Sequence, residues 1–153
     1  MTMPIPAPAA EDRDAGVALA GLLPRVFAVF LVLHGLAHVY GFTTPWGIAS
    51  PRRADYSTLI LNGSIDIGDA AIKAMSFLWL GAVFAFALAG LMVWRGHPWA
   101  RRTTVAVVLG SLVICAIRVP GSVIGLAIDV VLLALLAVAS DRLIVTPAGR
   151  AHV

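Results

Sequence analysis

Residues 74–94 read AMSFLWLGAVFAFALAGLMVW and contain no charged side chain. A helix needs about 20 mostly apolar residues to cross a bilayer, so this segment predicts a transmembrane helix. Further apolar runs occupy residues 24–42, 103–119 and 121–140. Four such spans predict an all-α fold, a four-helix transmembrane bundle.

The composition excludes several other classes of protein. The chain of 153 residues is 60% apolar and 12% charged, with a mean hydropathy of +0.95, whereas soluble domains are about 45–50% apolar and about 25% charged. A soluble globular fold and a disordered chain are therefore excluded. Cys115 is the single cysteine, so an intramolecular disulfide is excluded as well. Basic clusters interleaved with aromatic residues, which mark nucleic-acid binding, are absent from the sequence. The bilayer, and no nucleic acid, is the expected partner.

The segments outside the spans are of three kinds. Residues 1–22 include MTMPIPAPAAEDRDAG, which is rich in proline and acidic residues and predicts a disordered tail. Residues 23–142 form the predicted transmembrane domain, and residues 143–153 a flexible C-terminal tail. The one long connection, residues 43–68, predicts a partly ordered loop that caps one end of the bundle.

The distribution of lysine and arginine predicts the orientation, because cytoplasmic loops carry an excess of both. Seven basic residues share the side of the two termini and four share the side of the long loop: Arg13, Arg25, Arg95, Arg101, Arg102, Arg142 and Arg150 against Arg52, Arg53, Lys73 and Arg118. The sequence therefore predicts cytoplasmic termini and an extracytoplasmic loop. The predominance of Arg over Lys, with abundant Ala, Val and Gly, indicates a GC-rich bacterial genome. Together with the apolar spans it predicts a protein of the bacterial cytoplasmic membrane.

Ionisable side chains inside the spans are the candidate functional residues, because they are costly in a bilayer and usually face the bundle interior. His34 and His38 are four residues apart and share one helix face. The helical pitch places them in the same half of the bilayer as the long loop. The predicted polar pocket in that half comprises His34, His38, Asp69, Cys115, Arg118 and Asp129.

The histidine pair has two readings. His34 and His38 could ligate haem or a divalent metal ion, with Asp69 or Asp129 completing the site, because a closed zinc site takes four ligands. The segment HGLAH lacks the glutamate of a zincin motif. In the other reading the imidazoles form hydrogen bonds that hold helices together.

The charged residues also have alternatives. Asp129 and Arg118 could form a buried ion pair, or Asp129 could act as a proton-accepting carboxylate. Asp66 and Asp69 could simply cap the second span, and Asp69 could pair with Lys73 at i,i+4.

Cys115 has two readings as well. It could be an inert, small apolar residue, since reactive thiols need an electropositive and partly exposed setting. Arg118, one helical turn away, leaves a reactive role open.

Three segments carry a resemblance to known proteins: LVLHGLAHVYGF, SIDIGDA and CAIRVPGSVIGLAIDVVLL. In layout the chain, over residues 24–140, resembles the DoxX-like group of small four-span bacterial membrane proteins. It is also similar to uncharacterised actinobacterial membrane proteins. The resemblance implies four helices with an outward loop after the first, and a link to quinone-coupled redox chemistry in some members. It implies no site residue, because no catalytic motif of the group matches this chain.

The function predicted from the sequence is binding of a lipophilic small molecule, such as a lipid or a quinone-like compound. His34 and His38 would be polar contacts, while Asp129 and Arg118 would fix charge or relay protons. Whether the protein is an enzyme stays open, with His38 or Asp129 as the candidate base. The alternatives are haem or metal binding through the two histidines, and a non-enzymatic accessory subunit of a larger membrane complex. The expected protein partners are a second copy of the chain, in a homo-oligomer, or that larger complex.

Overall fold

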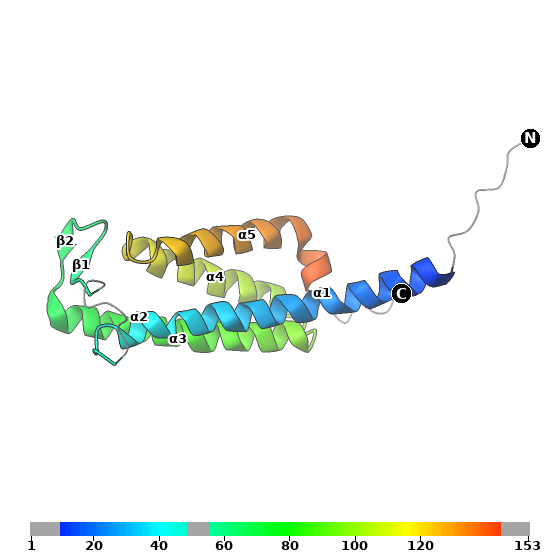
Figure 1. Ribbon diagram of the computed structural model, residues 1–153, viewed down its shortest axis with the longest axis horizontal. Coiled ribbons are helices and arrows are strands. Elements are labelled where there is room, and N and C mark those ends of the chain that lie inside the picture. Colours follow the sequence, from blue (N-terminus) through cyan, green and yellow to red (C-terminus); the bar gives the residue numbers. More distant parts are fainter. Residues whose placement is uncertain (1–9, 49–55, 145–153) are drawn as a thin grey trace, which may run out of the picture.

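A computed structural model describes residues 10–48 and 56–144 of the chain, with the side chains of residues 21–48, 56–139 and 142–144. In chain order its elements are α1 (Ala10–Ala37), α2 (Val39–Thr43), β1 (Leu59–Ile60), β2 (Ile65–Asp66), α3 (Gly68–Trp94), α4 (Ala100–Ile117) and α5 (Val123–Leu143). The helices α1, α3, α4 and α5 lie side by side, and β1 and β2 lie at one end of them (Figure 1). Parts of both expected tails and of the long loop, residues 1–9, 49–55 and 145–153, lie outside the described residues.

Three helical stretches are long and apolar enough to cross a membrane, as the sequence predicts: Gly21–Thr43, Gly68–Trp94 and Ala100–Ile117. The fourth apolar helix, Val123–Ala139, is shorter. It is the regular part of α5, which begins after a turn at residues 118–122 and departs from helical geometry at Ala139. The helix therefore begins two residues later than the expected span 121–140.

The first helix begins earlier than expected. It starts at Ala10, inside the predicted disordered tail 1–22, so that Pro24 lies within the helix and not at its start. The composition allows the earlier start, because residues 10–20 contain no proline and four alanines besides Glu, Leu and Arg, and alanine has the highest helix propensity.

The predicted first span is interrupted at His38, between α1 and α2. The imidazole Nδ1 of His38 donates a hydrogen bond to the carbonyl oxygen of His34 at 3.0 Å. The backbone N–H of His38 turns instead to the carbonyl of Gly35, also at 3.0 Å. The side chain thus replaces the i→i−4 backbone hydrogen bond of a regular helix, and the chain tightens into a turn.

A small β-hairpin occupies the described part of the long loop, so the fold is not purely all-α. β1 pairs antiparallel with β2, and positive φ angles at Leu61, Asn62 and Gly63 reverse the chain between them. The N–H groups of Leu61 and Asn62 donate to the carbonyls of Ile117 at 2.8 Å and Val119 at 3.1 Å. These bonds fix the hairpin to the turn between α4 and α5.

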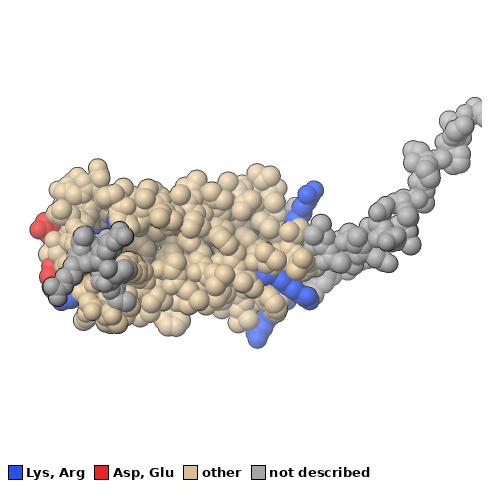
Figure 2. All heavy atoms as spheres, in the orientation of Figure 1, with Lys and Arg blue, Asp and Glu red and all other residues tan. Residues whose placement is uncertain are grey.

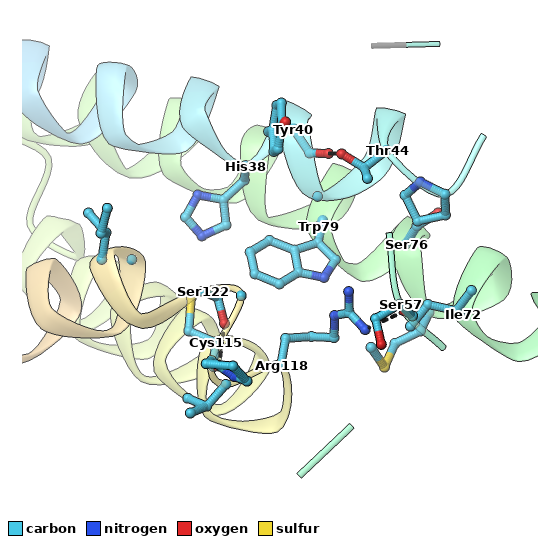
Figure 3. A pocket seen from close by; sticks show the side chains of 18 of the residues that line it. His38, Tyr40, Thr44, Ser57, Ile72, Ser76, Trp79, Cys115, Arg118 and Ser122 are labelled. Atoms are coloured by element: carbon cyan, nitrogen blue, oxygen red, sulfur yellow. Dashed lines mark hydrogen bonds between the residues drawn. The ribbon is translucent and has the colours of Figure 1, made fainter. Parts of the chain in front are cut away.

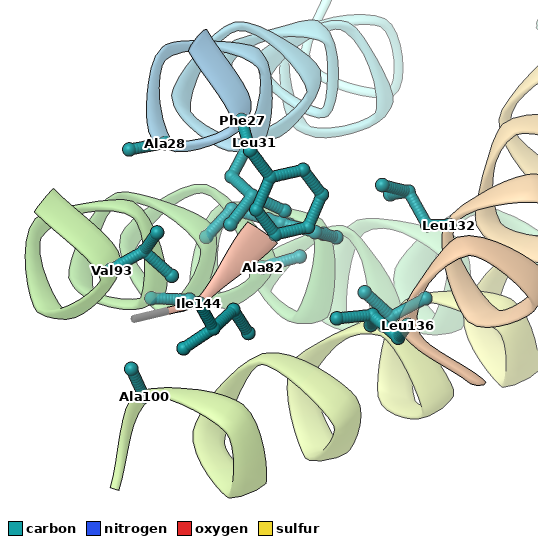
Figure 4. Packing of buried hydrophobic residues seen from close by; sticks show 12 residues of the cluster. Phe27, Ala28, Leu31, Ala82, Val93, Ala100, Leu132, Leu136 and Ile144 are labelled. Atoms are coloured by element: carbon teal, nitrogen blue, oxygen red, sulfur yellow. The ribbon is translucent and has the colours of Figure 1, made fainter. Parts of the chain in front are cut away.

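The helices pack as two antiparallel pairs, α1 with α3 and α4 with α5, and α3 also contacts α4 (Figure 1). Glycine allows the close approach within the first pair: a Cβ at Gly90 would lie 2.8 Å from the carbonyl oxygen of Ala28. Small residues at such contacts let two helix backbones come together in a membrane. Between the pairs lies an apolar cluster whose side chains converge from all four helices (Figure 4): Phe27, Ala28, Leu31, Ala82, Phe86, Ala89, Val93, Ala100, Val108, Leu132, Leu136 and Ile144.

Charge separates to the two ends of the bundle (Figure 2). Exposed arginines gather at the end where α3 finishes, α4 begins and α5 finishes: Arg25, Arg95, Arg101, Arg102 and Arg142. The exposed Asp66 and Asp69 lie at the hairpin end. The Arg25 guanidinium lies over the Trp94 ring, 5.9 Å from its centroid, an aromatic and basic pairing typical of membrane interfaces.

Candidate functional site

Four buried side chains from three helical segments form a continuous chain of hydrogen bonds, called here the polar network: His34, His38, Ser111 and Asp129. His34 Nε2 lies 2.9 Å from Asp129 Oδ1. Ser111 Oγ donates to Asp129 Oδ2 at 2.7 Å, and His38 Nε2 lies 2.8 Å from Ser111 Oγ. The network therefore joins α1 to α4 and α5 inside the bundle.

Helix geometry explains how the sequence builds this network. His34 and His38 stand one turn apart on the same face, as predicted, and Asp129 reaches them from the interior face of α5. The exposed fraction is 0% for Asp129 and at most 6% for the other three residues. No buried side-chain nitrogen or oxygen among the described residues lacks a hydrogen-bond partner. The polar atoms are thus satisfied inside the protein, as an apolar environment requires.

Aromatic rings of α3 cover the network. The Phe86 ring centroid lies 4.9 Å from that of His34 and 5.4 Å from that of His38. Trp79 lies next to His38 at 5.3 Å. The two imidazoles are therefore held between their polar partners and an apolar wall.

A cavity of about 1020 Å³ lies between this network and the hairpin, where the ends of α1, α3, α4 and α5 meet (Figure 3). His34, His38, Cys115 and Arg118 line it, whereas Asp69 and Asp129 do not. Most of the remaining lining is apolar or small: Ala37, Gly41, Pro45, Leu59, Gly63, Ile72, Met75, Val119, Pro120, Gly121, Ile124, Gly125 and Ile128.

Arg118 does not form the predicted ion pair with Asp129. Its Nη1 donates to the backbone carbonyls of Ser57 at 2.9 Å and Leu59 at 3.1 Å, in and beside the hairpin. Asp129 bonds at the level of Ser111, which lies seven residues, about 10 Å along a helix, before Arg118. The two charges are thus at different depths, and Arg118 fastens the hairpin to the end of α4.

We expect Arg118→Met to loosen the hairpin. The methionine keeps an apolar stem but removes both hydrogen bonds from a charged donor, which are worth about 1.5–3 kcal/mol each before solvent exposure reduces them. Limited proteolysis should cut residues 56–67 several-fold faster in this variant. Arg95→Met, at the opposite end of the bundle, should not change that rate, and equal cleavage in both variants would contradict the role of Arg118.

Asp69 lies outside the cavity, contrary to the predicted pocket. It is exposed, accepts a hydrogen bond from Lys73 at 2.7 Å and another from Tyr56. The Lys73 contact is the i,i+4 pair that the sequence allowed. The hydrogen bond to Asp69 raises the pKa of the Tyr56 phenol, because the carboxylate stabilises the protonated form.

Asp66 binds the start of α3, as the sequence allowed, but the N-cap residue is Ile67, whose side chain forms no capping hydrogen bond. Its Oδ1 accepts a hydrogen bond from the N–H of Gly68, the first residue of α3, at 3.0 Å. Hydrogen bonds from the Thr58 hydroxyl and from this N–H lower the pKa of the Asp66 carboxyl. Asp66 therefore stabilises the junction between the hairpin and α3.

The geometry offers little to a metal ion. Both ring nitrogens of His38 are engaged, by the His34 carbonyl and by Ser111, and Nε2 of His34 is engaged by Asp129. Within the described part of the chain no group of three or more His, Cys, Asp or Glu side chains is placed to hold a metal. Cys115 is fully buried and adjoins Gly125.

Two residues of the candidate site, Ser111 and Trp79, are missing from the predicted pocket. Ser111 bridges His38 to Asp129, and its spacing from Cys115 and Arg118 on one helix face was a usable signal. Trp79 lines the cavity, and no partner for its indole N–H exists among the described residues. Nothing in the apolar run around Trp79 distinguishes it from the other aromatic residues there.

Comparisons of this chain with protein-family models, with curated proteins and with solved structures find no match. The resemblance to DoxX-like proteins therefore stays a prediction.

Proposed function

We propose that this chain is a small integral membrane protein whose cavity binds a lipophilic small molecule, such as a lipid or a quinone-like compound. The observation that carries the proposal is the cavity of about 1020 Å³ at one end of apolar helices. Ligand sites are typically of about 300–1,000 Å³, mostly apolar, with a few polar groups that orient the ligand. This cavity has that character and would accommodate an aliphatic tail or an isoprenoid-like chain.

Two donors are available for the polar head of such a ligand. The Trp79 indole N–H has no acceptor among the described residues, and the Arg118 guanidinium has donors beyond the Nη1 that binds Ser57 and Leu59. Both side chains project into the cavity (Figure 3). This pair favours a head group that accepts hydrogen bonds, such as a carbonyl, carboxylate or phosphate. Three of the four ring nitrogens of His34 and His38 are already engaged in the polar network, so the pair is less suited to direct contact with the ligand than the sequence suggested.

Filling the cavity tests the proposal. Ala37 lines it, so Ala37→Trp should remove most of the compound that copurifies in mild detergent, measured by mass spectrometry of an organic-solvent extract. Ala74→Trp is the matched control, because Ala74 is exposed on α3 and does not line the cavity. The wild type and Ala74→Trp should yield the same lipophilic compound, near one per chain.

The same preparation separates the alternatives. A Soret band, or a metal near one per chain, would favour ligation by His34 and His38 and contradict the lipophilic ligand. No bound compound in any variant would favour an accessory subunit in which the polar network only joins helices.

We further infer that the basic end of the bundle, with both termini, faces the bacterial cytoplasm. Its support is the clustering of exposed arginines at that end (Figure 2).

Cysteine labelling tests this orientation. Ser64→Cys in the hairpin should react with a membrane-impermeant maleimide on intact cells, whereas Pro98→Cys between α3 and α4 should react only after lysis. The native Cys115 is fully buried and should not react in either case. The reverse labelling pattern would show that the hairpin, and not the basic end, faces the cytoplasm.

A further inference from the structure

The donors and acceptors of the polar network fix how many protons it holds. His38 Nδ1 lies 3.0 Å from the carbonyl oxygen of His34. A carbonyl can only accept a hydrogen bond, so Nδ1 must carry a hydrogen. A neutral imidazole has one N–H, which leaves Nε2 of a neutral His38 as an acceptor.

The next contacts need hydrogens of their own. Ser111 has one hydroxyl hydrogen but two close partners, Asp129 Oδ2 at 2.7 Å and His38 Nε2 at 2.8 Å. If the hydroxyl donates to Asp129, two lone pairs face each other between Ser111 and His38. If it donates to His38, lone pairs face each other between Ser111 and an ionised Asp129. One additional hydrogen removes the conflict in either case.

We propose that the polar network holds one proton more than two neutral imidazoles and an ionised carboxylate supply, and that Ser111 relays this proton between His38 and Asp129. In one arrangement His38 is an imidazolium that donates to Ser111, and Ser111 donates to an ionised Asp129. In the other, Asp129 is a carboxylic acid that donates to Ser111, and Ser111 donates to a neutral His38. His34 donates from Nε2 to Asp129 in both.

The two arrangements differ by a concerted shift of two protons. The His38 Nε2–H bond breaks as a bond forms to Ser111 Oγ, while the Ser111 O–H bond breaks as a bond forms to Asp129 Oδ2. No electron is transferred and the network stays neutral throughout. Neutrality also agrees with its burial, because an uncompensated carboxylate in this interior would be strongly disfavoured.

The surroundings add no second counter-charge. Cys115, on α4, is a further titratable side chain that interacts with Ser111 and Asp129. Its thiol S–H could only donate a hydrogen bond, so it does not change the number of protons that the polar network must hold. The rings that α3 places against the histidines, Phe86 and Trp79, carry no charge. Arg118 is bound to the carbonyls of Ser57 and Leu59.

The network meets the cavity through its histidines. His34 and His38 line the cavity, whereas Asp129 is 0% exposed. Proton exchange with the cavity therefore passes through an imidazole, and His34 Nδ1 is the ring nitrogen that the bonds of the network leave available. This activity does not depend on which molecule the cavity binds, and it suits a ligand that gains or loses a proton.

Spectroscopy of the full-length protein at neutral pH tests the proton count. Nitrogen-15 NMR of labelled histidine measures the fraction of His38 that is imidazolium. Infrared difference spectroscopy against Asp129→Asn measures the fraction of Asp129 that is carboxylic acid. We expect these two fractions to sum to about one proton per chain. A wild-type protein with His38 singly protonated and Asp129 ionised would overturn the proposal without any need for a folded variant.

Variants of the bridge test the relay itself. Ser111→Thr keeps the hydroxyl and should keep the additional proton, whereas Ser111→Ala should lose it. Ser122→Ala is the matched control, because its hydroxyl donates to the Cys115 carbonyl, outside the network. A Ser111→Ala protein that retains the additional proton would overturn the bridging role of Ser111.

Discussion

Asp129→Ala should lower the free energy of unfolding by about 3 kcal/mol. The substitution removes the acceptor for His34 Nε2 and for Ser111 Oγ, both buried. Each buried donor left without a partner costs about 1–3 kcal/mol. Measured by reversible unfolding in mixed micelles, the loss should appear as an earlier transition without a change in helix content before it.

A surface carboxylate provides the control. Asp69 is exposed and paired with Lys73, and exposed ion pairs contribute little to stability because solvent screens them, so Asp69→Asn should shift the transition very little. Asp129→Asn should fall between the two, because the amide keeps one acceptor but presents N–H groups to the other partner. If Asp129→Ala costs no more than Asp69→Asn, the polar network does not stabilise the bundle.

The second large effect is expected at Gly35, where α1 meets α3. A Cβ there would lie 2.5 Å from Phe86 Cβ, an atom next to the backbone that cannot rotate away. Overpacking of this kind costs about 1–3 kcal/mol. We expect the loss in the free energy of unfolding for Gly35→Ala to approach the upper end of this range, because separating α1 from α3 also displaces His34 from Asp129.

Gly81→Ala is the matched control within α3. A Cβ at Gly81 has nothing within 4 Å, and alanine is a better helix former than glycine by up to about 1 kcal/mol. This variant should be neutral or slightly more stable in the same unfolding measurement. If Gly35→Ala behaves like Gly81→Ala, the close α1–α3 contact is not required for stability.

Length and periodicity were sufficient to predict the three membrane-spanning stretches and the shared face of His34 and His38. Both properties depend only on the order of residues along one helix. The hairpin could not be predicted because its two strands are each two residues long, too short to show the two-residue alternation of a β-strand. The turn at His38 also escaped, since it arises from a ring nitrogen that competes for a backbone carbonyl.

Contacts between helices could be predicted less well. Asp129 and Arg118 were paired because both are charged and close in sequence, but the partners of Asp129 depend on how α1, α4 and α5 are rotated about their axes. That rotation is set by packing among residues such as Phe86 and Leu132, which no single helix reveals. Ser111 shows the same limit, because its role follows from two helices that approach it.

The fastening of the hairpin has a consequence for local unfolding. Its backbone bonds run to the turn between α4 and α5, while its second strand continues directly into α3. Local unfolding of the hairpin beside the cavity must therefore disturb the start of α3 and the end of α4 together. In hydrogen exchange, the amides of Leu61 and Asn62 would belong to one cooperative unit with that turn, and not to an independently fraying loop.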